Sequence, residues 1–144
     1  MHESVSQFFS ALHRDYLKPR RYKKVRHTFS RDMGGYTERV QFQGSAWNSA
    51  GGPWTFYINF GVQFRDLPDR VPCRDFPDTH CWTRIEYLVD GAPKQYDIPA
   101  NDTGSFAAEI TDCLDQASQA AERQISEIRN SYEQTHSPRL ETKL

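Results

Sequence analysis

The sequence has few cysteines, no long hydrophobic run and no visible secretion signal. Its three cysteines, Cys73, Cys81 and Cys113, are an odd number, which argues against a framework of paired disulfides. The first ten residues lack a basic region followed by an apolar run of about 7 to 15 residues. The most apolar stretch, residues 54–64, contains polar residues and is shorter than the ~20 residues of a membrane span. We therefore expect a cytoplasmic protein with reduced thiols and no membrane contact.

The sequence also lacks the short motifs that hold metals, phosphates or catalytic nucleophiles. It has no CxxC or HxxxH pair, and structural zinc sites usually need such spacing. Cys73, His80 and Cys81 come nearest to a ligand group, but adjacent residues of a strand point to opposite faces. There is no GxSxG turn, and the glycine pairs at 34–35 and 51–52 fit hairpin loops. We therefore predict no metal, no cofactor, no catalytic residue and no enzymatic activity.

The net charge of −1 excludes a uniformly basic or acidic surface, yet the charges are unevenly placed. Residues 1–44 hold nine basic and four acidic residues, whereas residues 45–144 hold nine and fifteen. Segment 18–31 has seven basic residues and no acid. We favour an edge strand that outward charges protect from aggregation, because few aromatic residues are interleaved there. A nucleic-acid contact is the alternative, and its residues would be Arg20, Arg21, Lys23, Lys24 and Arg26.

Negative charge gathers near the start of the last predicted helix. No Lys or Arg lies between positions 97 and 115. Part of this charge favours the positive end of a helix dipole. The remainder suits a protein that occupies the basic surface of a nuclease, because complementary charge accelerates encounter. The predicted acidic patch consists of Asp97, Asp102, Asp112 and Asp115.

The spacing of apolar residues predicts the order of helices and strands along the chain. Apolar residues at helical spacing predict a helix from about Ser4 to Pro19 and a long one from about Ser105. Alternation predicts an antiparallel meander of four to five strands, at residues 21–31, around Val40, and at 55–64, 81–89 and 95–98. The fold is then an α+β two-layer sandwich with both helices on one sheet face. Residues 1–130 form this single domain, and residues 131–144 form a polar tail that frays.

The opposite face of the predicted sheet carries a mixture of amide, aromatic and charged side chains. Trp, Tyr and Arg dominate the binding energy of many protein interfaces, and an exposed Trp favours a surface that something covers. An ordinary solvated sheet face is the alternative interpretation. The predicted partner-binding residues on this face are Gln43, Tyr57, Asn59, Trp82, Arg84 and Glu86.

Four stretches resemble the bacterial family known as domain of unknown function 4304. Residues 22–31 (YKKVRHTFSR), 40–45 (VQFQGS), 56–62 (FYINFGV) and 80–88 (HCWTRIEYL) are similar to successive strands of that family. The similarity spans roughly residues 5–125. It departs at Glu86, where the family has a small residue, and at residues 94–98 (KQYDI), where it often has a tryptophan-rich step. The resemblance implies a small soluble protein without agreed catalytic residues, some members being encoded in toxin and immunity neighbourhoods.

These observations favour a protein-binding module over an enzyme. The leading hypothesis is an immunity-type protein that neutralises a cognate bacterial toxin by occluding it, through either the sheet face or the acidic patch. One alternative is a nucleic-acid-binding protein that uses segment 18–31. The other is a small enzyme or ligand-binding protein built on Asn59, Arg84 and Glu86. The sequence predicts a protein partner and leaves the oligomeric state open.

Overall fold

A computed structural model describes residues 3–25, 28–45, 48, 54–64 and 82–136 of the chain. Three helical segments follow one another at the N-terminus: α1 (Glu3–Leu12), a π-helical turn η1 (His13–Leu17) and a 3₁₀ turn η2 (Lys18–Arg20). Six strands follow: β1 (Lys23–Val25), β2 (Thr28–Asp32), β3 (Tyr36–Gly44), β4 (Thr55–Phe64), β5 (Trp82–Arg84) and β6 (Tyr96–Asp97). The 3₁₀ turn η3 (Ile85–Tyr87) lies between β5 and β6, and α2 (Thr103–His136) comes last.

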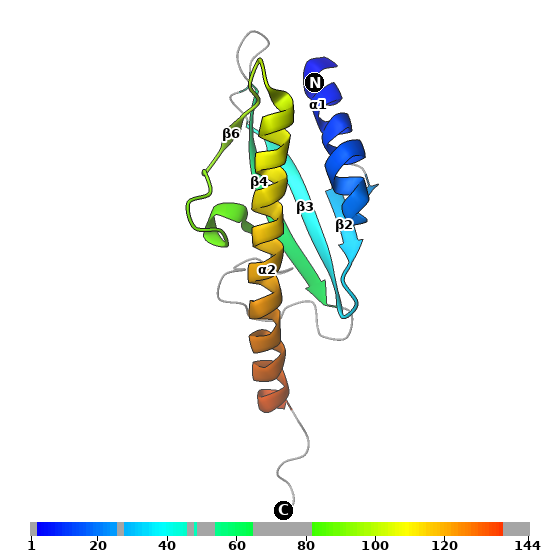
Figure 1. Ribbon diagram of the computed structural model, residues 1–144. Helices are drawn as coiled ribbons and strands as arrows, with labels where there is room; N and C mark the ends of the chain where they lie inside the picture. The colour runs from blue at the N-terminus through cyan, green and yellow to red at the C-terminus, as the bar shows by residue number, and fades with distance from the viewer. Residues whose placement is uncertain (1–2, 26–27, 46–47, 49–53, 65–81, 137–144) are drawn as a thin grey trace, which may run out of the picture.

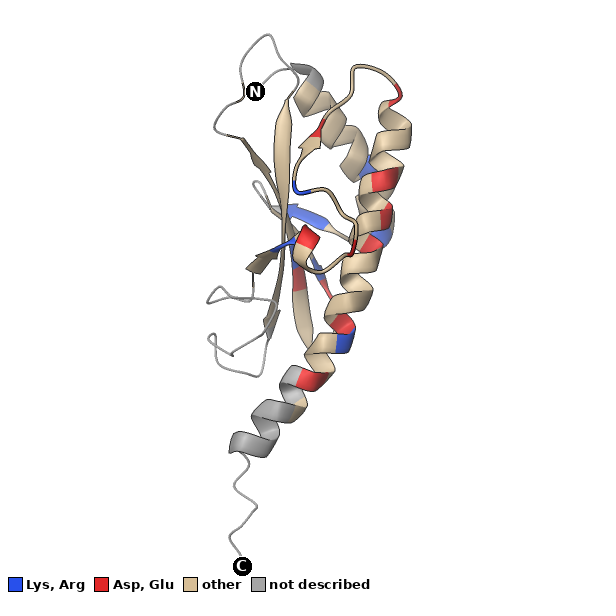
Figure 2. Cartoon of the chain, turned by 90° about the vertical axis from the view of Figure 1, so that its left-hand side faces the viewer, with Lys and Arg blue, Asp and Glu red and all other residues tan. Residues whose placement is uncertain are grey.

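The predicted fold class is confirmed. The sheet is antiparallel, with the order β1-β2-β3-β4-β5, and β6 pairs with β4. Both helices lie on one face of this sheet, and α2 runs along its whole length (Figure 1). Seen from the side, the helices form one layer and the sheet the other, as Figure 2 shows. No helix in the described ranges is long and apolar enough to cross a membrane.

The core lies between these two layers. Alternate residues of β4 are fully buried and meet apolar residues from α1, η1 and α2: Phe56, Ile58, Phe60, Val62, Leu12, Leu17, Ile110 and Leu114. Aromatic rings join the two helices to the sheet at one end, where Phe9 lies 5.4 Å and Phe106 lies 6.2 Å from the ring of Phe56. Each fully buried ring of this kind stabilises the fold by about 1.5–3 kcal/mol.

The single strand predicted at residues 21–31 is wrong. Two strands occupy this segment, and they form a hairpin in which Val25 and Thr28 are Cα partners. Cα partners on antiparallel strands share a face of the sheet, whereas residues three apart in one continuous strand would lie on opposite faces. Lys24 therefore shares a face with its Cα partner Phe29, which a single strand would place on the opposite face. Because both strands alternate with a period of two, their sequence resembles that of one long strand.

The fourth predicted strand, residues 81–89, is too long, while the short fifth strand is confirmed as β6. Strand β5 ends at Arg84, and the chain then forms η3, in which Leu88 N donates to Ile85 O at 2.9 Å. A 3₁₀ helix has three residues per turn, so the side chains stop alternating between the two faces of the sheet at Ile85. This change leaves Tyr87 68% exposed. Helix α2 continues to His136, beyond residue 130, and residues 137–144 of the predicted tail lie outside the described residues.

Candidate functional site on the uncovered sheet face

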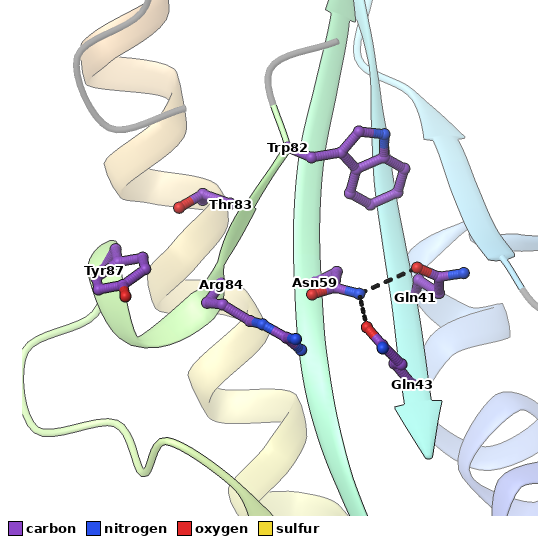
Figure 3. Close-up of a pocket in the computed structure, with 7 residues that line it drawn as sticks. All are labelled: Gln41, Gln43, Asn59, Trp82, Thr83, Arg84 and Tyr87. Carbon is purple, nitrogen blue, oxygen red and sulfur yellow. Dashed lines mark hydrogen bonds between the residues drawn. The ribbon is translucent and has the colours of Figure 1, made fainter. Parts of the chain in front are cut away.

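Alternate residues of β3, β4 and β5 form the sheet face that no helix covers. The register places Gln41 opposite Asn59, and Asn59 in turn opposite Arg84, so a row of polar side chains crosses three strands. A hollow of about 480 Å³ opens over this row (Figure 3). Its lining residues in the described part of the chain are Gln41, Gln43, Asn59, Trp82, Thr83, Arg84 and Tyr87. The structure therefore brings together Gln43, Tyr57, Asn59, Trp82 and Arg84 of the predicted surface.

Asn59 organises the amides of this face. Its Nδ2 donates hydrogen bonds to Gln41 Oε1 and to Gln43 Oε1, each at 3.0 Å, as Figure 3 shows. Both glutamine oxygens thus point toward Asn59, which leaves the glutamine Nε2 groups as the outward ends of the two amides. The two glutamines are fixed in orientation before any ligand arrives.

Trp82 lies flat over the backbone of β4 at Gly61. A Cβ atom at Gly61 would come within 2.8 Å of the indole ring, far inside van der Waals contact, so the ring requires glycine at this position. The guanidinium of Arg39 lies 4.7 Å from the ring centroid and stacks on the same indole. The sequence predicted an exposed tryptophan; the structure shows a partly buried one, held between strand and arginine.

The two arginines of the face stack on aromatic rings and form no ion pair with the residues that the structure describes. Arg84 lies 4.4 Å from the centroid of Tyr57. Within the described part of the chain, the NH1 atom of Arg84 and the Nε atom of Arg39 are buried without a hydrogen-bond partner. None of the ion pairs within the described ranges includes either arginine. Burial lowers the pKa of Arg39 from its ordinary value. The face therefore holds two fixed cations whose hydrogen-bonding capacity is incompletely used.

Glu86 does not belong to this face, contrary to the prediction. It lies in η3, beyond the end of β5, so strand parity no longer applies to it. Its carboxylate helps to raise the pKa of Tyr96 and of Cys113, after the larger effect of burial at both groups. Tyr96 and Cys113 belong to the core beneath α2. Glu86 therefore acts on the helix side of the sheet, and the ligand site predicted from Asn59, Arg84 and Glu86 loses its acid.

The four predicted acidic residues are divided among separate local contacts. Asp115 forms a two-pronged ion pair with Arg20, with both N···O distances at 2.9 Å. Asp112 accepts a hydrogen bond from Gln116 at 3.1 Å, and Asp97 accepts one from the hydroxyl of Thr55. Asp102 precedes α2 with a φ of 59°. The acidic residues of α2 lie in the helix layer, away from the uncovered sheet face (Figure 2).

The predicted nucleic-acid segment is similarly divided. Arg20 is paired with Asp115, and Arg21 ends η2 with a φ of 71°. Lys23 and Lys24 occupy successive positions of β1 and therefore point to opposite faces. Arg26 lies outside the described residues. This placement disperses the basic residues that the sequence groups together.

A buried charged network between β2, β3 and α2 was not predicted from the sequence. Glu38 is fully buried, and both of its oxygens are used: Arg31 Nε donates to Oε1 at 3.0 Å and Ser118 Oγ donates to Oε2 at 2.5 Å. The hydroxyl of Tyr22 also donates to Oε1. Burial, assisted by the charge of Glu38, raises the pKa of Tyr22. Glu38 shares strand parity with Val40, and Arg31 with Phe29, so two opposite charges at inward positions were the available signal.

The metal-ligand candidates fall into two groups. Cys73, His80 and Cys81 lie outside the described residues. Among the residues that the structure does describe, no three His, Cys, Asp or Glu side chains gather closely enough to hold a metal ion. Cys113 is buried and contacts the hydroxyl of Tyr96 at 3.6 Å.

Comparison with known proteins identifies the family. The model of the family described as Domain of unknown function (DUF4304) matches residues 13–130. No curated protein and no solved structure matches the chain. The matched range runs from η1 through every described strand into α2, so it contains the whole uncovered sheet face. The chain belongs to the DUF4304 family.

Proposed function

We propose that this protein is a non-catalytic binding module, and specifically an immunity-type protein whose uncovered sheet face occludes a cognate bacterial toxin. The observation that carries the proposal is the assembled group of Trp82, Tyr57, Arg84 and Arg39 around the Asn59 amide cluster. These residue types supply most of the binding energy at many protein interfaces. The toxin context comes from the resemblance to members encoded in toxin and immunity neighbourhoods.

The face is suited to binding because its side chains are held before a partner arrives. Ring stacking restrains both arginines, and hydrogen bonds restrain the glutamines. A partner therefore loses less affinity to side-chain ordering, which costs about 0.5–1.5 kcal/mol for each immobilised side chain.

The dimensions of the face set an upper limit on the area that a protein partner covers there. Strands β3 and β4 contain 9 and 10 residues, and at ~3.3 Å per residue they are roughly 30 Å long. The three strands of the face are spaced ~4.8 Å apart and, with their side chains, are about 15 Å wide. The product is at most roughly 450 Å², because β5 has only three residues, which is about half of the ~800 Å² that one partner contributes to a standard interface.

The lining of the hollow supports binding rather than catalysis. It consists of amides, aromatic rings, a threonine and an arginine, without a carboxylate, imidazole or thiol among the described lining residues. General acid–base catalysis near neutral pH usually needs one of those groups within hydrogen-bond reach of the substrate. The chemistry of this surface is recognition.

The proposal is tested by co-expressing the protein with the product of each adjacent gene and measuring growth. One neighbour should arrest growth alone, and co-expression of this protein should restore it. Trp82→Ala should reduce the rescue at least tenfold in viable counts. Asp112→Asn, on the exposed surface of α2, is the matched control and should rescue like the wild type. Rescue that survives Trp82→Ala but fails with Asp112→Asn would assign binding to the acidic helix instead.

A further inference from the structure

We infer that the hollow on the uncovered face receives a carboxylate side chain from an acidic segment of a protein partner, with Arg84 as its main contact. The inference rests on the proposed binding function and adds the chemistry of the group that is bound. It follows from the hydrogen-bonding groups that the structure leaves unused around the hollow.

Arg84 is held at the edge of the hollow with its hydrogen bonds incompletely used. Its guanidinium lies 4.4 Å from the centroid of the Tyr57 ring, and the NH1 atom is buried without a partner among the described residues. The side chain lines the hollow and is partly exposed, so an acceptor in the hollow would contact the other N–H groups of the guanidinium. An ionised carboxylate is the best such acceptor, because a guanidinium binds it through two parallel hydrogen bonds.

The amides beside Arg84 direct their oxygen atoms inward. Gln41 and Gln43 both accept a hydrogen bond from Asn59 Nδ2, so the ends left for a ligand are N–H donors. Figure 3 shows Arg84 on one flank of Asn59 and the two glutamines on the other, and all four residues line the hollow. N–H donors from two strands therefore border the hollow, and a group that only accepts hydrogen bonds is complementary to them.

The separate stacking of the two guanidiniums favours a protein segment over a nucleic acid as the ligand. The guanidiniums of Arg39 and Arg84 stack on two different rings, those of Trp82 and Tyr57, and the Asn59 amide cluster lies among them. A phosphate backbone is bound best by a continuous row of cations, whereas isolated guanidiniums beside aromatic rings suit single carboxylates flanked by apolar side chains. The hollow, at about 480 Å³, has room for a Glu side chain together with its neighbours.

The experiment is a titration of the ¹⁵N-labelled full chain followed by NMR. The probes are a blocked peptide with two glutamates flanking a phenylalanine, the same peptide with glutamines, inorganic phosphate and a single-stranded oligonucleotide of equal charge. We expect saturable shifts of the Arg84 Nε–H and glutamine side-chain signals with the glutamate peptide, and at least tenfold weaker binding of the glutamine peptide. The inference is overturned if both peptides bind equally, or if the oligonucleotide or phosphate binds more tightly than the glutamate peptide.

Variants separate this inference from the proposed function. Arg84→Gln should weaken the glutamate peptide at least tenfold and Arg84→Lys by less, because the lysine keeps charge without the planar fork. Arg14→Gln, which removes an exposed arginine of η1, is the matched control and should bind normally; each variant is checked for a wild-type amide spectrum. If Arg84→Gln and Arg84→Lys both bind like the wild type, the inference is wrong. Toxin rescue that Trp82→Ala abolishes would then still support the proposed function.

Discussion

Arginines on the two faces of the sheet stack on aromatic rings in the same way, but they differ in their partners. Under the helices, Arg31 lies 4.4 Å from the ring of Tyr22 and also pairs with Glu38. On the uncovered face, Arg39 and Arg84 lie at similar distances from Trp82 and Tyr57, and no described carboxylate pairs with them. Among the described residues, the charged network is complete on the covered face and incomplete on the uncovered face, where we propose that a partner binds.

The largest expected loss of unfolding free energy comes from a substitution on the face of the sheet that the helices cover. Glu38→Ala removes the carboxylate that Arg31, Tyr22 and Ser118 share, and leaves a guanidinium whose side chain is only 12% exposed without its counterion. Breaking a buried ion pair in this way usually costs 3–5 kcal/mol of unfolding free energy, so we expect roughly that loss in urea unfolding. A loss of unfolding free energy below about 1 kcal/mol for Glu38→Ala would mean that the network does not stabilise the fold. Ser118→Ala should reduce the unfolding free energy by about 1 kcal/mol, the usual value of one hydrogen bond.

A smaller loss of unfolding free energy is expected at Gly61, where the backbone of β4 contacts the Trp82 ring. Gly61→Ala places a Cβ within 2.8 Å of the Trp82 ring, and we expect about 1–3 kcal/mol of destabilisation from this overpacking. The double variant with Trp82→Ala is the test, because the clash disappears with the ring. In that background Gly61→Ala should be neutral or slightly stabilising, since alanine is less flexible than glycine in the unfolded chain. Equal costs in both backgrounds would show that the indole does not lie on Gly61.

The ion pair between Arg20 of η2 and Asp115 of α2 should contribute less to the free energy of unfolding than the buried Glu38 network. Both side chains are about a third exposed, at 35% for Arg20 and 38% for Asp115, so solvent screens much of their attraction. We expect Arg20→Gln to cost about 0.5–1 kcal/mol at low salt, a value typical of exposed pairs with good geometry. The cost should fall at 1 M NaCl, measured by the same unfolding assay, because salt screens exposed charges. A cost as large as that of Glu38→Ala would place this pair with the buried network.

The fold was predictable from the sequence to the extent that one residue period held along each element. Strand β4 alternates over ten residues, so its buried and uncovered sides were both predicted. The prediction was wrong after Val25, where β1 ends and a separate strand β2 pairs with it, and again at Ile85, where a 3₁₀ turn replaces the strand. Glu86 was assigned to the wrong side for that reason alone.

The candidate site was predictable as a set of residues but not as an arrangement. Parity placed Tyr57, Asn59, Trp82 and Arg84 on one face, and the register confirms that they share it. Trp82 needs a glycine at position 61 because the two residues are cross-strand neighbours. The register that makes them neighbours is set by strand pairing in the folded protein, so the sequence pattern did not reveal it. The same limit hid the link between Arg20 and Asp115, which are 95 residues apart in the chain.

The smallest expected effect on stability is the sharpest test of the difference between the faces. Arg84→Gln removes a guanidinium that stacks on Tyr57 but pairs with no described acid, and it also removes a buried donor without an acceptor. Loss of stacking, about 0.5–1 kcal/mol at an exposed site, opposes the gain from losing the unpaired donor, about 1–3 kcal/mol. We therefore expect an unfolding free energy within about 1 kcal/mol of the wild type, or slightly above it. Arg31→Gln should instead cost several kcal/mol, because it strands the buried carboxylate of Glu38. If the two substitutions destabilise the protein equally, Arg84 stabilises the fold in the same way as Arg31, and the proposed binding role of Arg84 loses this support.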